Sequence, residues 1–159
     1  MPGSRRVWCS CVILDYLKGA PNAEEQCGLI IEAAEKGQTE IIVSALAEAE
    51  VGNIEGELPE YAEDMIREFF SRPYVLKANL DPPVAEIARD LIRKYRIKGA
   101  DAAHVATALH WNIPVFETYD GPLSRKINAN LTLLPSPLIV REPFWEGQAK
   151  MGDLFSSGP

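Results

Sequence analysis

The chain has 159 residues, of which 47% are hydrophobic and 25% are charged, so it is expected to form one compact domain and not a disordered segment. It contains 16 lysines and arginines against 23 aspartates and glutamates, which gives a net charge of −7. This balance excludes general electrostatic attraction to nucleic acid, because phosphates are bound by lysine and arginine. Binding of RNA or DNA would need a local basic face, or acidic residues that hold a metal ion.

The cysteines and the apolar runs indicate the cellular compartment. Cys9, Cys11 and Cys27 are odd in number and irregular in spacing, so they predict neither a disulfide framework nor a zinc motif. A reducing, cytoplasmic location is the simplest interpretation. No apolar run is long enough to span a membrane or to form the core of a signal peptide. Residues 1–6 are expected to be a flexible N-terminus, part of which cloning can introduce.

The first half of the chain alternates short apolar runs with helical patterns. The runs at residues 7–9 and 41–43 predict buried strands, the second because it is β-branched. Ser44 directly follows the second strand and is a good helix N-cap. The helices predicted in this half span residues 12–17, 23–36, 45–57 and 59–70.

The second half continues the alternation. Strands are predicted at residues 74–76, 114–116 and 131–134. One helix is predicted to begin after Asp81, which is followed by two prolines suited to a first turn, and another to run from about Asp101 to residue 111. Proline and glycine recur beyond residue 134. We therefore predict one domain over residues 7–134 and a C-terminal tail over residues 135–159.

Strands that alternate with helices predict an α/β fold, here a single three-layer α/β/α domain with a parallel sheet of about five strands. The order of the strands stays open, because two of the connections carry a pair of helices. Functional residues of such sheets lie beyond the carboxyl ends of the strands. The positions to inspect are therefore those that follow Trp8, Val43, Leu76 and Phe116.

Three carboxylates fall near these positions. Helical spacing places Glu50 on the apolar side of its helix and Glu48 toward water, and a carboxylate on a buried face needs a cation or another partner. Asp101 begins an alanine-rich helix, and Asp120 closely follows the strand at 114–116. Each also has a simpler interpretation, as a half-exposed glutamate, a helix cap and a turn aspartate before glycine. Together they would be hard oxygen ligands for Mg²⁺ or Mn²⁺.

These residues stand in motifs that resemble the PIN domain, the fold of VapC-type toxin ribonucleases and of several RNA-processing nucleases. The most specific motif is Asp101-Ala-x-His-x-Ala-Thr-Ala. It is accompanied by a turn that contains Ser10 after the first strand, by Ser44-x5-Glu50, and by Thr118-x-Asp120. The resemblance covers about residues 7–134.

The resemblance implies a divalent-metal-dependent endoribonuclease that hydrolyses RNA phosphodiester bonds as the toxin of a toxin–antitoxin pair. It implies that Glu50, Asp101 and Asp120 bind Mg²⁺ or Mn²⁺ and carry catalysis. Ser10 and Thr118 match the positions of hydroxyls that support these ligands. The expected partners are RNA, an antitoxin protein and, since many such domains pair, a second copy of the chain.

One position departs from the family pattern. Cys9 stands where the family has its first aspartate, at the end of strand one. A mostly neutral thiol is a poor ligand for a hard cation, so we expect impaired activity. The alternative is a catalytically inactive PIN-like module that binds RNA or protein. A third class, a small-molecule enzyme on a Rossmann-like sheet, lacks the glycine fingerprint.

Two further patterns carry less weight. Arg89, Arg93 and Arg96 are spaced along one face of a helix and would track an RNA backbone, although a solvated helix face is the simpler interpretation. His104 and His110 have no zinc spacing and no nucleophile beside them, so both are interpreted as packing or surface residues.

Overall fold

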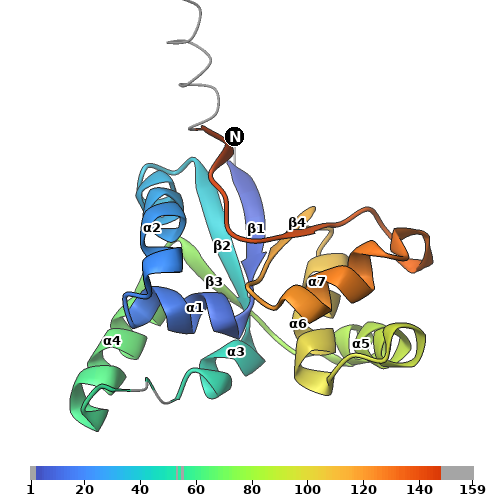
Figure 1. Cartoon of the computed structure of the whole chain (residues 1–159), viewed down its shortest axis with the longest axis horizontal. Coiled ribbons are helices and arrows are strands. Elements are labelled where there is room, and N and C mark those ends of the chain that lie inside the picture. The colour runs from blue at the N-terminus through green and yellow to red at the C-terminus, as the bar shows by residue number, and fades with distance from the viewer. Residues whose placement is uncertain (1–2, 53, 55, 148–159) are drawn as a thin grey trace, which may run out of the picture.

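The computed structural model describes residues 3–52, 54 and 56–147. Its centre is a sheet of five parallel strands in the order β3-β2-β1-β4-β5 (Figure 1). β1 therefore lies in the middle, between β2 and β4. The strands are β1 (Ser4–Trp8), β2 (Thr39–Ser44), β3 (Val75–Ala78), β4 (Val115–Glu117) and β5 (Ile139–Arg141).

Helices cover both faces of this sheet, which confirms the three-layer α/β/α prediction. One face carries α1 (Ser10–Leu17), α2 (Pro21–Glu35) and α4 (Pro59–Ser71), while the other carries α5 (Pro82–Tyr95), α6 (Gly99–His110) and α7 (Gly121–Asn128). The short α3 (Ala45–Glu50) follows β2 at the lower edge in Figure 1. No described helix combines the length and apolar character needed to cross a bilayer.

The central strand separates two hydrophobic cores. Trp8 is fully buried on the α1–α2 side, where its ring lies parallel to that of Phe69 with centroids 6.2 Å apart. Val7 and Cys9 point to the opposite side and join the core under α5 and α6. Successive residues of a strand face opposite sides, so an apolar run without polar alternation is what a strand covered on both faces requires.

The alanines of α6 determine how closely this helix approaches the sheet. Ala102, Ala106 and Ala108 are completely buried, and α6 contacts β1, β2 and β4 as well as α5. Small side chains let the helix backbone lie close to the strands. The first turn of α6, which carries Asp101, is thereby held at the carboxyl edge of the sheet.

The last strand is the main error of the sequence prediction. Residues 131–134 are not a strand: Leu131–Leu133 form a 3₁₀ turn whose two leucines are exposed. The edge strand is β5, which lies inside the region assigned to the tail and is parallel to β4. Burial distinguishes the two segments, because Leu138 and Val140 are buried in the core while Leu131 and Leu133 are exposed and only Leu134 packs partly against it.

Smaller differences concern the ends of elements. α3 ends at Glu50, well short of the predicted residue 57, and α7 was not predicted at all. Asp81 is the N-cap of α5 as predicted, but its carboxylate makes no capping hydrogen bond. β1 begins at Ser4 and includes the buried Arg6, so the strand starts within the segment expected to be flexible.

An ionic network ties the C-terminal segment to the sheet. Arg6 on β1 and Glu117 on β4 are only 1% and 0% exposed, and Nη1 of Arg6 lies 3.1 Å from Oε2 of Glu117. Glu117 also accepts hydrogen bonds from the indole of Trp8 and from Nε of Arg141. Glu146 pairs with both arginines. The network fixes the end of β4, two residues before Tyr119 and three before Asp120.

Candidate functional site

The carboxyl ends of β1, β2 and β4 come together at one edge of the sheet, as expected for parallel strands. Cys9 follows β1 and is the N-cap residue of α1. Ser44 ends β2, and its hydroxyl accepts a hydrogen bond of 3.2 Å from the amide of Leu46 at the start of α3. Thr118 follows β4 directly. This edge is therefore the place where the predicted site residues should meet.

Asp101 and Asp120 line the same cavity, which has a volume of about 200 Å³. Asp101 lies in the first turn of α6, whose N-cap is Lys98, so the interpretation of Asp101 as a helix cap is wrong. Asp120 is the N-cap of α7, and its Oδ1 accepts a hydrogen bond of 2.9 Å from the amide of Leu123. The capping role leaves the rest of the Asp120 carboxylate available to the cavity.

Two of the predicted carboxylates, Asp120 and Glu50, act on the charge of the third, Asp101. Burial raises the pKa of Asp101, and the negative charges of Asp120 and Glu50 raise it further. His104 and Lys98 act in the opposite direction. Without a cation, the ionised form of Asp101 is disfavoured, and a divalent ion in the cavity would relieve this repulsion.

Glu50 is held at the end of α3 by a partner that the sequence analysis missed. Its carboxylate accepts a hydrogen bond from Nε2 of His104 on α6, and its side chain is 33% exposed. His104 is completely buried, and within the described residues its Nδ1 has no hydrogen-bond partner. The helical spacing from Asp101 to His104 could have revealed this role, since positions i and i+3 share one face.

Glu48 behaves as the helical spacing predicted. Its side chain is 45% exposed and forms a surface ion pair of 3.1 Å with Lys77 on β3. Glu50, in contrast, turns toward α6 and meets a buried histidine. The different surroundings of these two carboxylates confirm that only Glu50 faces the interior side of α3.

Thr118 positions Asp120. Its Oγ1 accepts a hydrogen bond of 3.0 Å from the backbone amide of Asp120 and lies 3.3 Å from Sγ of Cys11. The same sulfur accepts a hydrogen bond of 3.4 Å from the amide of Tyr119. Cys11 is thus part of the turn that carries Asp120, although nothing in its sequence context had indicated this.

Cys9 and Cys11 differ sharply in acidity. A hydrogen bond from the Cys9 thiol, together with those from Thr118 and the amides of Tyr119 and Asp120, lowers the pKa of Cys11 to about 6. The hydrogen bond to Cys11 and burial raise the pKa of Cys9 well above its ordinary value. Cys9 is therefore a neutral thiol at neutral pH.

Not every predicted residue reaches the cavity that Asp101 and Asp120 share. Glu50, Cys9, Ser10 and Thr118 are absent from its lining. Ser10 begins α1, and its hydroxyl makes no hydrogen bond to another described side chain or backbone group. Within the described part of the chain, no group of three or more His, Cys, Asp or Glu side chains is arranged to hold a metal ion. The chemistry of the two aspartates fits Mg²⁺ or Mn²⁺, and that of the Cys9 thiol does not.

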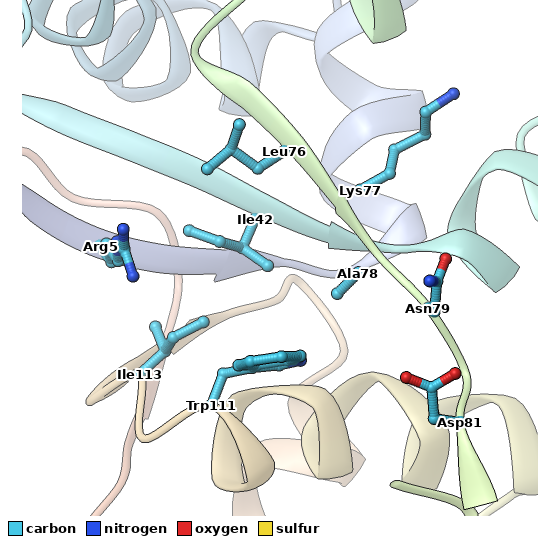
Figure 2. Close-up of a pocket in the computed structure, with 9 residues that line it drawn as sticks. All are labelled: Arg5, Ile42, Leu76, Lys77, Ala78, Asn79, Asp81, Trp111 and Ile113. Atoms are coloured by element: carbon cyan, nitrogen blue, oxygen red, sulfur yellow. The ribbon is translucent and has the colours of Figure 1, made fainter.

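A second cavity, of about 320 Å³, lies elsewhere on the same side of the sheet. Figure 2 shows an apolar wall that Ile42, Leu76, Ile113 and Trp111 form between β3 and the end of α6. Asp81 is the single carboxylate in its lining. None of the predicted site residues reaches it, so the cavity with two aspartates remains the candidate site.

Solved structures of the same fold come from several bacteria. VapBC2 from Rickettsia felis, solved with a DNA fragment from its promoter, matches with a TM-score of 0.64 at 12% identity over 86% of this chain and 98% of that chain. VapC20 from Mycobacterium tuberculosis, a toxin that cleaves the sarcin–ricin loop, matches with a TM-score of 0.59 at 11% identity over 76% and 93% of the two chains. FitAcB from Neisseria gonorrhoeae matches with a TM-score of 0.58 at 18% identity over 87% and 97%.

These identities show a shared fold, and the sequence comparison adds the family. No curated protein matches the chain. The model of the PIN domain, however, matches residues 10–127, a span that begins at the start of α1 and ends within α7. It includes the three predicted carboxylates together with His104 and Thr118. Since the match extends over most of its length, this chain belongs to the PIN domain family.

Proposed function

We propose that the protein is a divalent-metal-dependent endoribonuclease and the toxin component of a toxin–antitoxin pair. The observation that carries this proposal is the cavity at the carboxyl edge of the sheet, which Asp101 and Asp120 line together. The negative charge of Glu50 also raises the pKa of Asp101. Membership of the PIN domain family supports nuclease chemistry at this place.

In this proposal each residue has a separate task. Asp101 and Asp120 hold Mg²⁺ or Mn²⁺, and Glu50 completes the ligand set. Bound there, the ion supplies an activated water and neutralises charge on the phosphoryl oxygens. Thr118 fixes the backbone at Asp120, and His104 keeps the Glu50 carboxylate directed toward α6. Ser10 keeps its proposed supporting role beside the first turn of α1.

The proposed substrate is RNA, and the proposed partners are an antitoxin protein and a second copy of this chain. The likeness to VapC20 supports RNA as the substrate, and the likeness to the VapBC2 structure supports an antitoxin partner. We infer a cytoplasmic site of action from the absence of a disulfide pattern among the cysteines. The described cysteines are all free thiols.

Cys9 is proposed to weaken metal binding and therefore cleavage. It follows the central strand, it is buried, and its thiol is protonated at neutral pH. The same observation favours the second candidate function, a PIN-like module that binds RNA or protein without catalysis. The two candidates differ in whether an acid at this position creates activity.

The test compares the wild-type protein with Cys9→Asp. A labelled single-stranded RNA is incubated with each protein in Mn²⁺, and melting is measured with and without the metal. We expect Cys9→Asp to cleave faster and to gain more stability from Mn²⁺, because a fourth hard ligand binds the ion in the folded state. Asp101→Asn in the Cys9→Asp background is the control and should abolish both effects.

Equal cleavage and equal melting shifts in the two proteins would contradict the proposed role of position 9. RNA binding that is unchanged by a chelator, without cleavage by either protein, would instead support the non-catalytic module.

A further inference from the structure

The unpaired basic side chains of the protein gather in one region. Most lysines and arginines in the described part of the chain form an ion pair with a carboxylate. The described lysines and arginines without an ion pair all belong to α5, to the loop that follows α5, or to α7. They are Arg89, Arg93, Arg96, Lys98, Arg125 and Lys126.

Three of these cations line the cavity of the two aspartates. Arg96, Lys98 and Lys126 stand around it, and all three side chains are exposed. The ammonium of Lys126 donates a hydrogen bond of 3.1 Å to the carbonyl of Arg96, which joins α7 to the end of α5. Arg96 itself has a positive φ of 52° and turns the chain out of α5 toward Lys98.

A fourth cation lies beside Asp120. A Cβ added at Gly121 would stand 3.1 Å from Nη1 of Arg125, so this guanidinium packs against the backbone next to Asp120. We call Arg96, Lys98, Arg125 and Lys126 the basic rim. The basic rim lies around the two aspartates that bind a metal ion in the proposed function. A phosphodiester that contacts this metal ion would place its negative charge beside the four residues of the rim.

We propose that the basic rim binds the phosphates of single-stranded RNA on either side of the bond that the site cleaves. This inference rests on the proposed function and assigns its substrate-binding residues. Lysine and arginine bind nucleic acids because they neutralise phosphates and release counterions. In a chain of net charge −7, only lysines and arginines that are not already paired with a carboxylate are available for this. The residues of the rim are binding residues and not catalytic ones.

The positions of Arg93 and Arg89 favour a nucleic acid over an acidic protein segment. They continue from Arg96 along α5 at helical spacing, while Lys94 on the same helix is neutralised by Asp90. The unpaired charge thus extends away from the cavity in one direction. A polymer with one charge on every nucleotide matches such a line of cations beyond the site itself.

The test measures binding of a fluorescein-labelled single-stranded RNA by anisotropy, in EDTA so that no cleavage occurs. Lys98→Gln and Arg96→Gln should each weaken binding on the order of ten-fold, as expected for the loss of a hydrogen bond between charged groups. The slope of log affinity against log salt should fall by about 0.7 for each phosphate contact removed. Lys98→Arg, which keeps the charge, should restore most of the affinity.

The matched control is Lys36→Gln, which removes the same charge from the end of α2 on the opposite face of the sheet. It should bind RNA as the wild-type protein does. Lys98 is the most informative position, because its side chain forms no hydrogen bond or ion pair with another described residue, so its loss should leave the fold intact. Unchanged melting of Lys98→Gln checks this.

The outcomes separate the inference from the proposed function. If RNA binds the wild-type protein and the rim variants equally well, the inference is overturned while cleavage in Mn²⁺ can still support the nuclease. A rim that binds labelled oligoglutamate but not RNA would overturn it in favour of an acidic protein partner. If neither binding nor cleavage of RNA is found for the wild-type and Cys9→Asp proteins, both proposals fail.

Discussion

The imidazole of His104 on α6 donates a hydrogen bond from Nε2 to the carboxylate of Glu50 at the end of α3. The two residues are far apart in the sequence and belong to helices that follow different strands. The hydrogen bond joins the two helices directly at the carboxyl edge of the sheet. Because α3 is a short helix of six residues, this contact is important for the position of its last side chain.

We therefore expect His104→Gln to weaken Mn²⁺ binding about ten-fold, the usual effect of removing a group that orients a ligand. Glutamine keeps an amide donor but does not fill the same buried volume. Isothermal titration with Mn²⁺ measures the affinity, and His110→Gln, a change at the partly exposed C-terminal end of α6, serves as the control. An unchanged affinity in His104→Gln would show that Glu50 does not depend on this histidine.

Asp101→Asn should stabilise the protein in the absence of metal. The raised pKa of Asp101 means that its carboxyl favours folding in the protonated form and that this contribution is lost as the pH rises through its folded pKa. Asparagine does not ionise, so the melting temperature of the variant should exceed that of the wild type at neutral pH. The difference should disappear in acid, near the ordinary pKa of aspartate.

Thermal melting in EDTA over a pH series checks this prediction. Adding Mn²⁺ should then stabilise the wild-type protein and not the variant. A variant that is less stable than the wild type at neutral pH would indicate that the Asp101 carboxylate makes a favourable contact there without any metal.

Cys11 should be the most reactive of the three cysteines near neutral pH. Its pKa is lowered to about 6, chiefly by the hydrogen bond from the Cys9 thiol, whereas burial raises the pKa of Cys27 to about 11. Alkylation by iodoacetamide requires a thiolate, so Cys11 should be labelled at pH ~7 and the other two only in alkali. Mass spectrometry of the digested protein over a pH series identifies the labelled peptide.

Cys9→Ala provides the matched control for Cys11. This variant removes the principal donor to the Cys11 sulfur, so the pH at which labelling of Cys11 is half-maximal should rise. Preferential labelling of Cys27 in the wild-type protein would contradict the assignment.

Arg6→Met should destabilise the fold by about 3–5 kcal/mol, because it leaves the buried carboxylate of Glu117 with only the longer, partly exposed contact to Arg141. Arg5→Met is a close control on the adjacent residue, since Arg5 forms a half-exposed ion pair of 3.5 Å with Glu40. That pair should contribute less than about 1 kcal/mol. Urea unfolding of both variants measures the two free energies, and similar values would show that the buried network stabilises little.

The sequence predicted the strands correctly where an apolar run is also buried in the folded protein. The runs at 41–43 and 114–116 are strands because β-branched and aromatic residues there pack on both faces, and Asp120 lies at the carboxyl edge because β4 ends just before it. The run at 131–134 has the same apolar appearance, but residues 131–133 are exposed and only Leu134 is partly buried. Local composition cannot distinguish these cases, since burial depends on strand pairing with distant residues.

The candidate site was predictable to a similar extent. The motif around Asp101 led to the correct helix and edge, and helical spacing oriented Glu50 correctly. The partner of Glu50 was missed because a histidine contact across two helices leaves no signature in either helix alone. Cys11 was missed for the same reason: its acidity comes from Cys9 and from groups that follow β4, more than a hundred residues later.

The central place of β1 has a consequence for protein synthesis. β1 pairs with β4, and the indole of Trp8 donates to Glu117, which lies 109 residues further along the chain. A nascent chain on the ribosome has β1 and β2 long before β4, and it has no Asp120 to face Asp101. The cavity that Asp101 and Asp120 line can therefore assemble only after translation has passed α7.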